Sequence, residues 1–239
     1  MEDLLNQRDE LAVLYPELRS AGGLVGAIRD SARSRSLDVG TVCPRENDLG
    51  QGGFSFRSNV REVIVKLGLE RRNFSISLFH SGEYAADGAV SSLDELVQLA
   101  NCWNRGDRLA ELILEFSFVN ANSADIARVD GGDAVWEMWE ILTTDPEFAA
   151  EAPLIKSLRK DVEIRKYMPY ASHGGIELKA PGDGLPMIRL DLPQAGDLVV
   201  PVVVREKNGA VRRTLHSVEG LEQAVREYID LYGAGESLD

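Results

Sequence analysis

Two stretches of this sequence share a pattern that is typical of the start of a helix. Ser-Leu-Asp-Glu-Leu-Val-Gln at 92–98 and Ser-Val-Glu-Gly-Leu-Glu-Gln at 217–223 agree in type at several positions, and Trp103 or Tyr228 stands eleven residues after each serine. A pair of apolar runs, typical of a β-hairpin, precedes each stretch. The similarity predicts one of two things: a hairpin-plus-helix unit that occurs twice, or two unrelated junctions that share only the residues favoured at helix starts.

The order of the predicted elements indicates an α+β fold with two lobes, each an antiparallel β-sheet with flanking helices. We place the first lobe at 1–119 and a helical linker segment with the second lobe at 120–239, because the spacer 120–132 is rich in Asn, Asp and Gly. Apolar runs predict strands at 60–67, 74–79, 83–90, 175–180, 186–191, 197–205 and 210–216. Asn208-Gly209 predicts a tight hairpin turn between the last two.

Helices are predicted where apolar residues recur at helical spacing after a capping residue. The expected ranges are 2–14, which Pro16 ends, then 18–35, 92–104, 109–116, 134–143, 146–166 and 218–230. Ser92, Asp107 and Asp133 are the expected N-caps of the three central helices. The stretches 40–53 and 167–175 are predicted to be loops.

Composition excludes several classes of protein and partner. No run of 18 apolar residues occurs, so we expect no membrane-spanning helix, and the acidic start lacks the basic region of a signal peptide. With Cys43 and Cys102 far apart and no paired-cysteine motif, a cytoplasmic location is expected. The net charge of −13 argues against nucleic acid and anionic membranes as partners. It permits a basic peptide or protein partner, although a charge of this sign is more often that of a solvated acidic surface.

Candidate catalytic residues gather in one stretch, 167–175. It contains Tyr167, Tyr170, Ser172 and His173, followed by two glycines. These side chains either line a pocket, with His173 as a general base and a tyrosine as proton donor, or pack as an ordinary loop. The sequence contains no nucleophile elbow, zinc-protease motif or phosphate-binding glycine loop. We therefore predict neither a cofactor nor a metal site.

A second candidate site is the acidic stretch 130–151, which contains no Lys or Arg. On a helical wheel Asp133, Glu137 and Glu140 form a stripe, and Trp136 borders it. An aromatic ring beside carboxylates is suited to hold a cationic peptide segment through ion pairs and a cation–π contact. The alternative is a solvated helix face on which Trp136 folds against a neighbour.

Several blocks of the sequence resemble an uncharacterised actinobacterial family that is labelled "natural product biosynthesis protein". The blocks are Tyr15-Pro16-Glu17-Leu18 with Ala21-Gly22-Gly23, the strand Arg72-Asn73-Phe74-Ser75-Ile76-Ser77, the helix pair around Trp103, Leu109, Glu111, Leu112, Phe116, Phe118 and Val119, and Tyr170-Ala171-Ser172-His173. This chain departs from the family in having Gly174 and Gly175 where an aromatic residue is expected after Ser-His. The resemblance implies a bacterial, cytoplasmic protein associated with a biosynthetic gene cluster, and it assigns no catalytic residue.

Two functions are consistent with these observations. The first is a non-catalytic binding or accessory protein for a peptide or protein in natural-product biosynthesis or competition, which includes an immunity-type protein that neutralises a basic toxin. The second is a tailoring enzyme of such a pathway, with its pocket at 167–175.

Overall fold

The protein divides into two compact units, Met1–Gly132 and Asp133–Asp239, which are described separately. The division falls at the end of the predicted spacer 120–132, whereas the sequence places the boundary after residue 119. The structure, a computed structural model, describes residues 11, 13–44, 54–58, 60–149, 151–172, 175–180, 187–191, 200–206, 209–215, 220, 223–227 and 229. Both units combine helices with an antiparallel sheet, which confirms the predicted α+β class.

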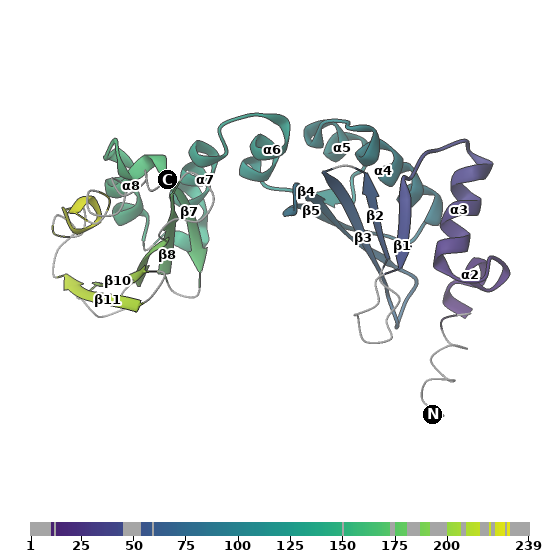
Figure 1. Cartoon of the computed structure of the whole chain (residues 1–239), viewed down its shortest axis with the longest axis horizontal. Coiled ribbons are helices and arrows are strands. Elements are labelled where there is room, and N and C mark those ends of the chain that lie inside the picture. The colour runs from purple at the N-terminus through teal and green to yellow at the C-terminus, as the bar shows by residue number, and fades with distance from the viewer. Residues whose placement is uncertain are drawn as a thin grey trace, which may run out of the picture. The chain divides into compact units, whose positions relative to one another are not determined.

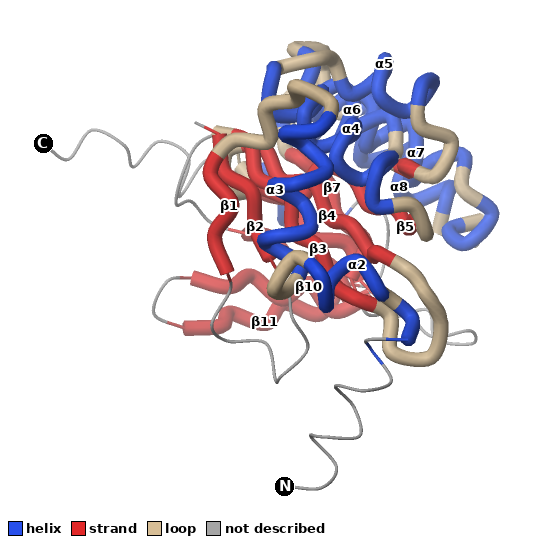
Figure 2. Tube along the Cα trace, turned by 90° about the vertical axis from the view of Figure 1, so that its right-hand side faces the viewer, coloured by secondary structure: helices blue, strands red, loops and turns tan. Residues whose placement is uncertain are grey.

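The first unit is built around a six-stranded sheet with strand order β1-β2-β3-β4-β5-β6, in which every neighbouring pair is antiparallel. Its elements are α2 Pro16–Ser20, α3 Leu24–Ser34, β1 Thr41–Pro44, β2 Phe54–Ser58, β3 Arg61–Leu67, β4 Phe74–His80, β5 Glu83–Val90, α4 Leu93–Arg105, α5 Leu109–Glu115, β6 Val119–Asn120 and α6 Ser123–Asp130. Helix α3 lies against one face of the sheet beside α4 (Figure 1, Figure 2).

The core of this unit follows from the alternation of side chains along β3 and β4. Val63 lies opposite Leu78 and Val65 opposite Ile76, so all four side chains point to the same face of the sheet. They are buried together with apolar residues of α3 and α4. The opposite positions of β3 and β4 are more polar, which explains why the sheet carries its helices on this face.

Helix α4 begins and ends where its sequence predicts. The Ser92 hydroxyl accepts the backbone N–H of Glu95 at 3.3 Å, and Gly106 ends the helix in the left-handed conformation that glycine adopts without strain. Trp103 is fully buried, donates its indole N–H to the Glu62 carbonyl, and lies beneath the Arg61 guanidinium at 4.4 Å. This tryptophan therefore joins α4 to β3 by apolar, polar and cation–π contacts.

Three predictions in the first unit are wrong. The single helix expected at 18–35 is two helices, because Gly22 and Gly23 adopt positive φ between α2 and α3. The loop expected at 40–53 includes the strand β1, which pairs with β2 at the edge of the sheet. The spacer 120–132 contains helix α6, which the Asn122 side chain caps through the N–H of Asp125.

The N-cap predicted for α5 is also wrong. Asp107 makes an ion pair with Arg105 instead. The start of α5 is held by Asp130 at the end of α6, whose buried carboxylate accepts the N–H groups of Leu109 at 2.8 Å and Ala110 at 3.0 Å. A residue distant in the sequence thus satisfies backbone donors that a local cap usually satisfies.

We expect Asp130→Ala to destabilise the first unit by about 0.5–2 kcal/mol, the usual effect of removing an N-cap. Protection of the Leu109 and Ala110 amides against hydrogen exchange should fall first. Asp107→Ala is the matched control, because an exposed ion pair with Arg105 contributes only about 0–1 kcal/mol. Hydrogen-exchange mass spectrometry measures both variants. A larger loss for Asp107→Ala would contradict this account of the cap.

The second unit contains a five-stranded antiparallel sheet with strand order β11-β10-β9-β8-β7. Its elements are α7 Ala134–Thr144, the 3₁₀ helix η1 Pro146–Phe148, α8 Ala152–Lys160, the 3₁₀ helix η2 Ile164–Lys166, β7 Met168–Ser172, β8 Gly175–Lys179, β9 Met187–Asp191, β10 Val200–Glu206 and β11 Gly209–Leu215. Residues 220, 223–227 and 229 are helical.

The core of the second unit lies where α7 packs against β7 and α8. Trp139 and Leu142 of α7 are buried with Ile155 and Leu158 of α8 and with Ile176 of β8. Asp133 caps α7 as predicted, since its carboxylate accepts the backbone N–H of Trp136 at 2.9 Å. The cap and the core together fix which side of α7 faces outward.

Two predictions for this unit are corrected and one stays untested. The helix expected at 146–166 is divided into η1, α8 and η2, and the loop expected at 167–175 includes strand β7, which pairs with β8. Ser217 and Tyr228, on which the internal similarity rests, lie outside the described residues, so the duplication remains a prediction.

In the described part of the chain, no helix is long and apolar enough to cross a membrane.

Candidate functional site

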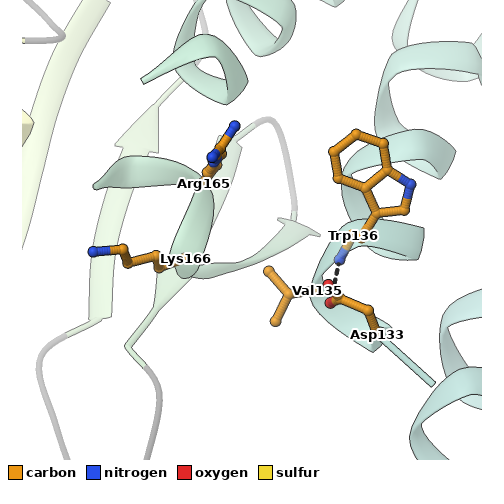
Figure 3. Close-up of a pocket in the computed structure, with 5 residues that line it drawn as sticks. All are labelled: Asp133, Val135, Trp136, Arg165 and Lys166. Atoms are coloured by element: carbon orange, nitrogen blue, oxygen red, sulfur yellow. Dashed lines mark hydrogen bonds between the residues drawn. The ribbon is translucent and has the colours of Figure 1, made fainter. Parts of the chain in front are cut away.

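The candidate site is a cavity of about 470 Å³ in the second unit, between the start of α7 and the 3₁₀ helix η2. Asp133, Val135 and Trp136 line it from α7, and Arg165 and Lys166 line it from η2 (Figure 3). Two of the four residues predicted to bind a partner, Asp133 and Trp136, therefore belong to it. Pockets of roughly 300–1,000 Å³ are typical of ligand sites, so the volume is sufficient for a few side chains of a peptide.

The two tryptophans of α7, Trp136 and Trp139, differ in exposure. Trp139, three residues later, points into the core with 1% of its surface exposed, whereas 48% of Trp136 is exposed. Trp103, the third tryptophan of the chain, is fully buried. Trp136 is consequently the one tryptophan of this protein that a ligand can reach directly.

The predicted acidic stripe is partly occupied by the chain itself. The Arg159 guanidinium of α8 lies 4.0 Å from the centre of the Trp136 ring and makes an ion pair with Glu140. The cation–π contact and ion pair expected with a partner are thus made internally at these two residues. Asp133 accepts a backbone N–H as the cap of α7, and Glu137 is half-buried on the same helix.

The opposite wall of the cavity is held in place by two sets of hydrogen bonds. The indole N–H of Trp139 donates to the Arg165 carbonyl at 3.1 Å, which joins η2 to α7. The Asp161 carboxylate accepts the N–H groups of Glu163 and Ile164 at the start of η2. These contacts use the backbone of η2, so the side chain of Arg165 stays exposed at the cavity.

The charges around the cavity are unevenly paired. The Lys166 ammonium contacts both carboxylate oxygens of Glu163, at 2.7 and 2.8 Å. No carboxylate among the described residues lies within ion-pair distance of Arg165. The sequence does not indicate Arg165 and Lys166 as lining residues, because it predicts one continuous helix over 146–166. Asp161, a residue type that favours helix starts, was the signal that a new turn begins there.

The two tyrosines predicted to line an enzyme pocket lie in different environments. Tyr167 is buried in the core of the second unit, and burial, together with the charge of Glu163, raises the pKa of its phenol. Tyr170 is 39% exposed and lies on β7 opposite Glu177. Ser172 ends β7, and His173 lies outside the described residues. The structure therefore buries one predicted phenol and exposes the other.

Neither a metal site among the described residues nor a similarity to known proteins indicates a function. Within the described ranges no group of three or more His, Cys, Asp or Glu side chains is placed to hold a metal ion. Comparisons with protein-family models, with curated proteins and with solved structures find no match to this chain. The function must accordingly be inferred from the geometry of the cavity.

Proposed function

We propose that this chain is a non-catalytic binding protein for a peptide or protein in bacterial natural-product biosynthesis or competition, and that the Trp136 cavity is its binding site. The observation that carries the proposal is an exposed tryptophan, Trp136, that lines a cavity of about 470 Å³. The resemblance of several sequence blocks to a natural-product biosynthesis family supports the pathway.

The physical chemistry of the cavity favours binding over catalysis. Exposed tryptophan is costly to hydrate, and buried tryptophan contributes more to protein interfaces than most other residues. The described lining residues comprise an aromatic ring, a valine, two cations and a carboxylate that caps a helix. These groups can anchor and orient a ligand. The two that could act as nucleophiles are engaged, because Lys166 pairs with Glu163 and the Asp133 carboxylate accepts the N–H of Trp136.

A selection experiment tests the proposal. A displayed library of random peptides is selected on the intact protein and, in parallel, on Trp136→Ala and on Val162→Ala, which removes another exposed apolar side chain of the same unit. We expect peptides that bind the unchanged protein and Val162→Ala alike and bind Trp136→Ala at least about tenfold more weakly, as is typical of a central aromatic anchor.

The direct measurement is tryptophan fluorescence. Because Trp103 and Trp139 are buried, a peptide that enters the cavity should change the emission of Trp136 and protect it from quenching by acrylamide. Circular dichroism of the variants confirms that they are folded. Selected peptides that bind all three proteins equally, or no enrichment on any of them, would refute the proposed site.

A further inference from the structure

We infer that the cavity recognises a carboxylate next to an apolar side chain, and that the ligand is therefore an acidic peptide segment. The inference rests on the proposed function and specifies its ligand. It is carried by the placement of the Arg165 guanidinium opposite the exposed Trp136 ring across one cavity (Figure 3). It reverses the basic partner that the acidic stretch 130–151 predicts.

Most charges at the cavity are already engaged within the chain. Glu140 is paired with Arg159, and the Asp133 carboxylate is engaged by the backbone N–H of Trp136. Lys166 is paired with Glu163, and in Figure 3 its side chain leads away from Trp136. Arg165 is therefore the cation of the cavity lining that has no carboxylate partner among the described residues.

The Arg165 side chain is suited to bind a carboxylate. A guanidinium presents a planar set of N–H donors that matches the two oxygens of a carboxylate, and such charge-assisted bonds are stronger than neutral ones. The Arg165 backbone is fixed by the bond from Trp139, so less conformational freedom is lost when its side chain binds. An apolar group of the same ligand would contact Val135 and the part of Trp136 that Arg159 leaves exposed.

The cavity presents cations although the net charge of the chain is −13. At physiological salt, exposed charges more than about 8 Å apart are largely screened, so distant carboxylates act weakly on a ligand in the cavity. Arg165 would be in contact with the ligand, whereas the charges of Arg159 and Lys166 are offset by Glu140 and Glu163. A basic peptide would meet the Arg165 guanidinium instead, which disfavours it.

Four matched tetrapeptides test the inference through the fluorescence of Trp136. Three are blocked at both ends and differ at one position: acetyl-Gly-Phe-Glu-Gly-amide, its Gln analogue and its Lys analogue. The fourth, acetyl-Gly-Gly-Gly-Phe with a free C-terminal carboxylate, separates a side-chain carboxylate from a chain terminus. We expect the Glu peptide to bind about tenfold more tightly than the Gln peptide, in line with a charge-assisted hydrogen bond, and the Lys peptide to bind most weakly.

Variants assign this preference to Arg165. Arg165→Gln should abolish the difference between the Glu and Gln peptides, because its exposed side chain is lost while the backbone bond from Trp139 remains. Lys160→Gln removes an exposed cation that does not line the cavity, and should leave the difference unchanged. Trp136→Ala should weaken the Glu and Gln peptides alike.

The outcomes separate the inference from the proposed function. Equal binding of the Glu, Gln and free-carboxylate peptides, tighter binding of the Lys peptide, or a preference that survives Arg165→Gln would overturn the inference. Trp136-dependent peptides from the random library would still support the proposed function in those cases. If the library also yields none, the binding site itself is refuted.

Discussion

Trp103→Ala is expected to lower the free energy of unfolding of the first unit by about 3–5 kcal/mol, the range for removing a large aromatic side chain from a core. The Trp103 ring is fully buried between α4 and the sheet. Its loss also removes the indole hydrogen bond to Glu62 and the surface on which the Arg61 guanidinium lies. A reduction of this size is a large part of the stability of an ordinary domain.

Hydrogen-exchange mass spectrometry tests this prediction because it resolves the two units. Amides of α4, β3 and β4 should lose protection in Trp103→Ala, while those of α7 and α8 should be much less affected, since they belong to the other compact unit. Leu114→Ala is the control, as this leucine of α5 is 87% exposed. A loss below about 1 kcal/mol for Trp103→Ala would show that the core of the first unit is not organised as described.

Elements whose signals are local could be predicted from the sequence. The capping serine and the glycine that ends α4 directly flank the helix they define, so Ser92 and Gly106 mark its limits correctly. Strand β4 shows the alternation of a half-buried strand, and β3 is a short apolar run joined to it by a polar link, as is typical of a hairpin. Helix α6 was missed because Asn122 and Gly131, which cap it, are also typical of loops.

Contacts between distant residues could not be predicted in this way. Asp133 and Trp136 were found because one caps the helix on which the other lies. Arg159 covers Trp136 and Arg165 faces it only because α8 and η2 fold back against α7, which no local pattern specifies. Tyr167 and Tyr170 are close in sequence, yet Tyr167 lies in the core directly before β7, whereas Tyr170 lies at an exposed position of β7.

Asp161→Ala is expected to destabilise the second unit by roughly 1–3 kcal/mol near neutral pH, the range for leaving buried hydrogen-bond donors without a partner. The Asp161 side chain is 3% exposed. It accepts the N–H groups of Glu163 at 2.8 Å and Ile164 at 3.2 Å, and it makes an ion pair with Arg226. Without it, the start of η2 and one wall of the cavity lose their anchor.

The destabilisation by Asp161→Ala should depend on pH, and its direction follows from the pKa of Asp161. Burial raises this pKa, but the hydrogen bonds from Ile164 and Glu163 and the contact with Arg226 outweigh it, so that the folded pKa is below the usual value. A carboxyl group with a lowered pKa stabilises the fold above its unfolded pKa of about 3.9, and this contribution is lost as pH falls through the folded pKa.

The difference in stability between the unchanged protein and Asp161→Ala should therefore be constant from about pH 7 to pH 5 and shrink below about pH 4. Urea unfolding followed by circular dichroism at several pH values measures it. Asp161→Asn is the graded control, because an amide oxygen can still accept a backbone N–H but cannot pair with Arg226 as a charge. A difference that grows as the solution is acidified would show that burial, rather than hydrogen bonding, dominates at Asp161.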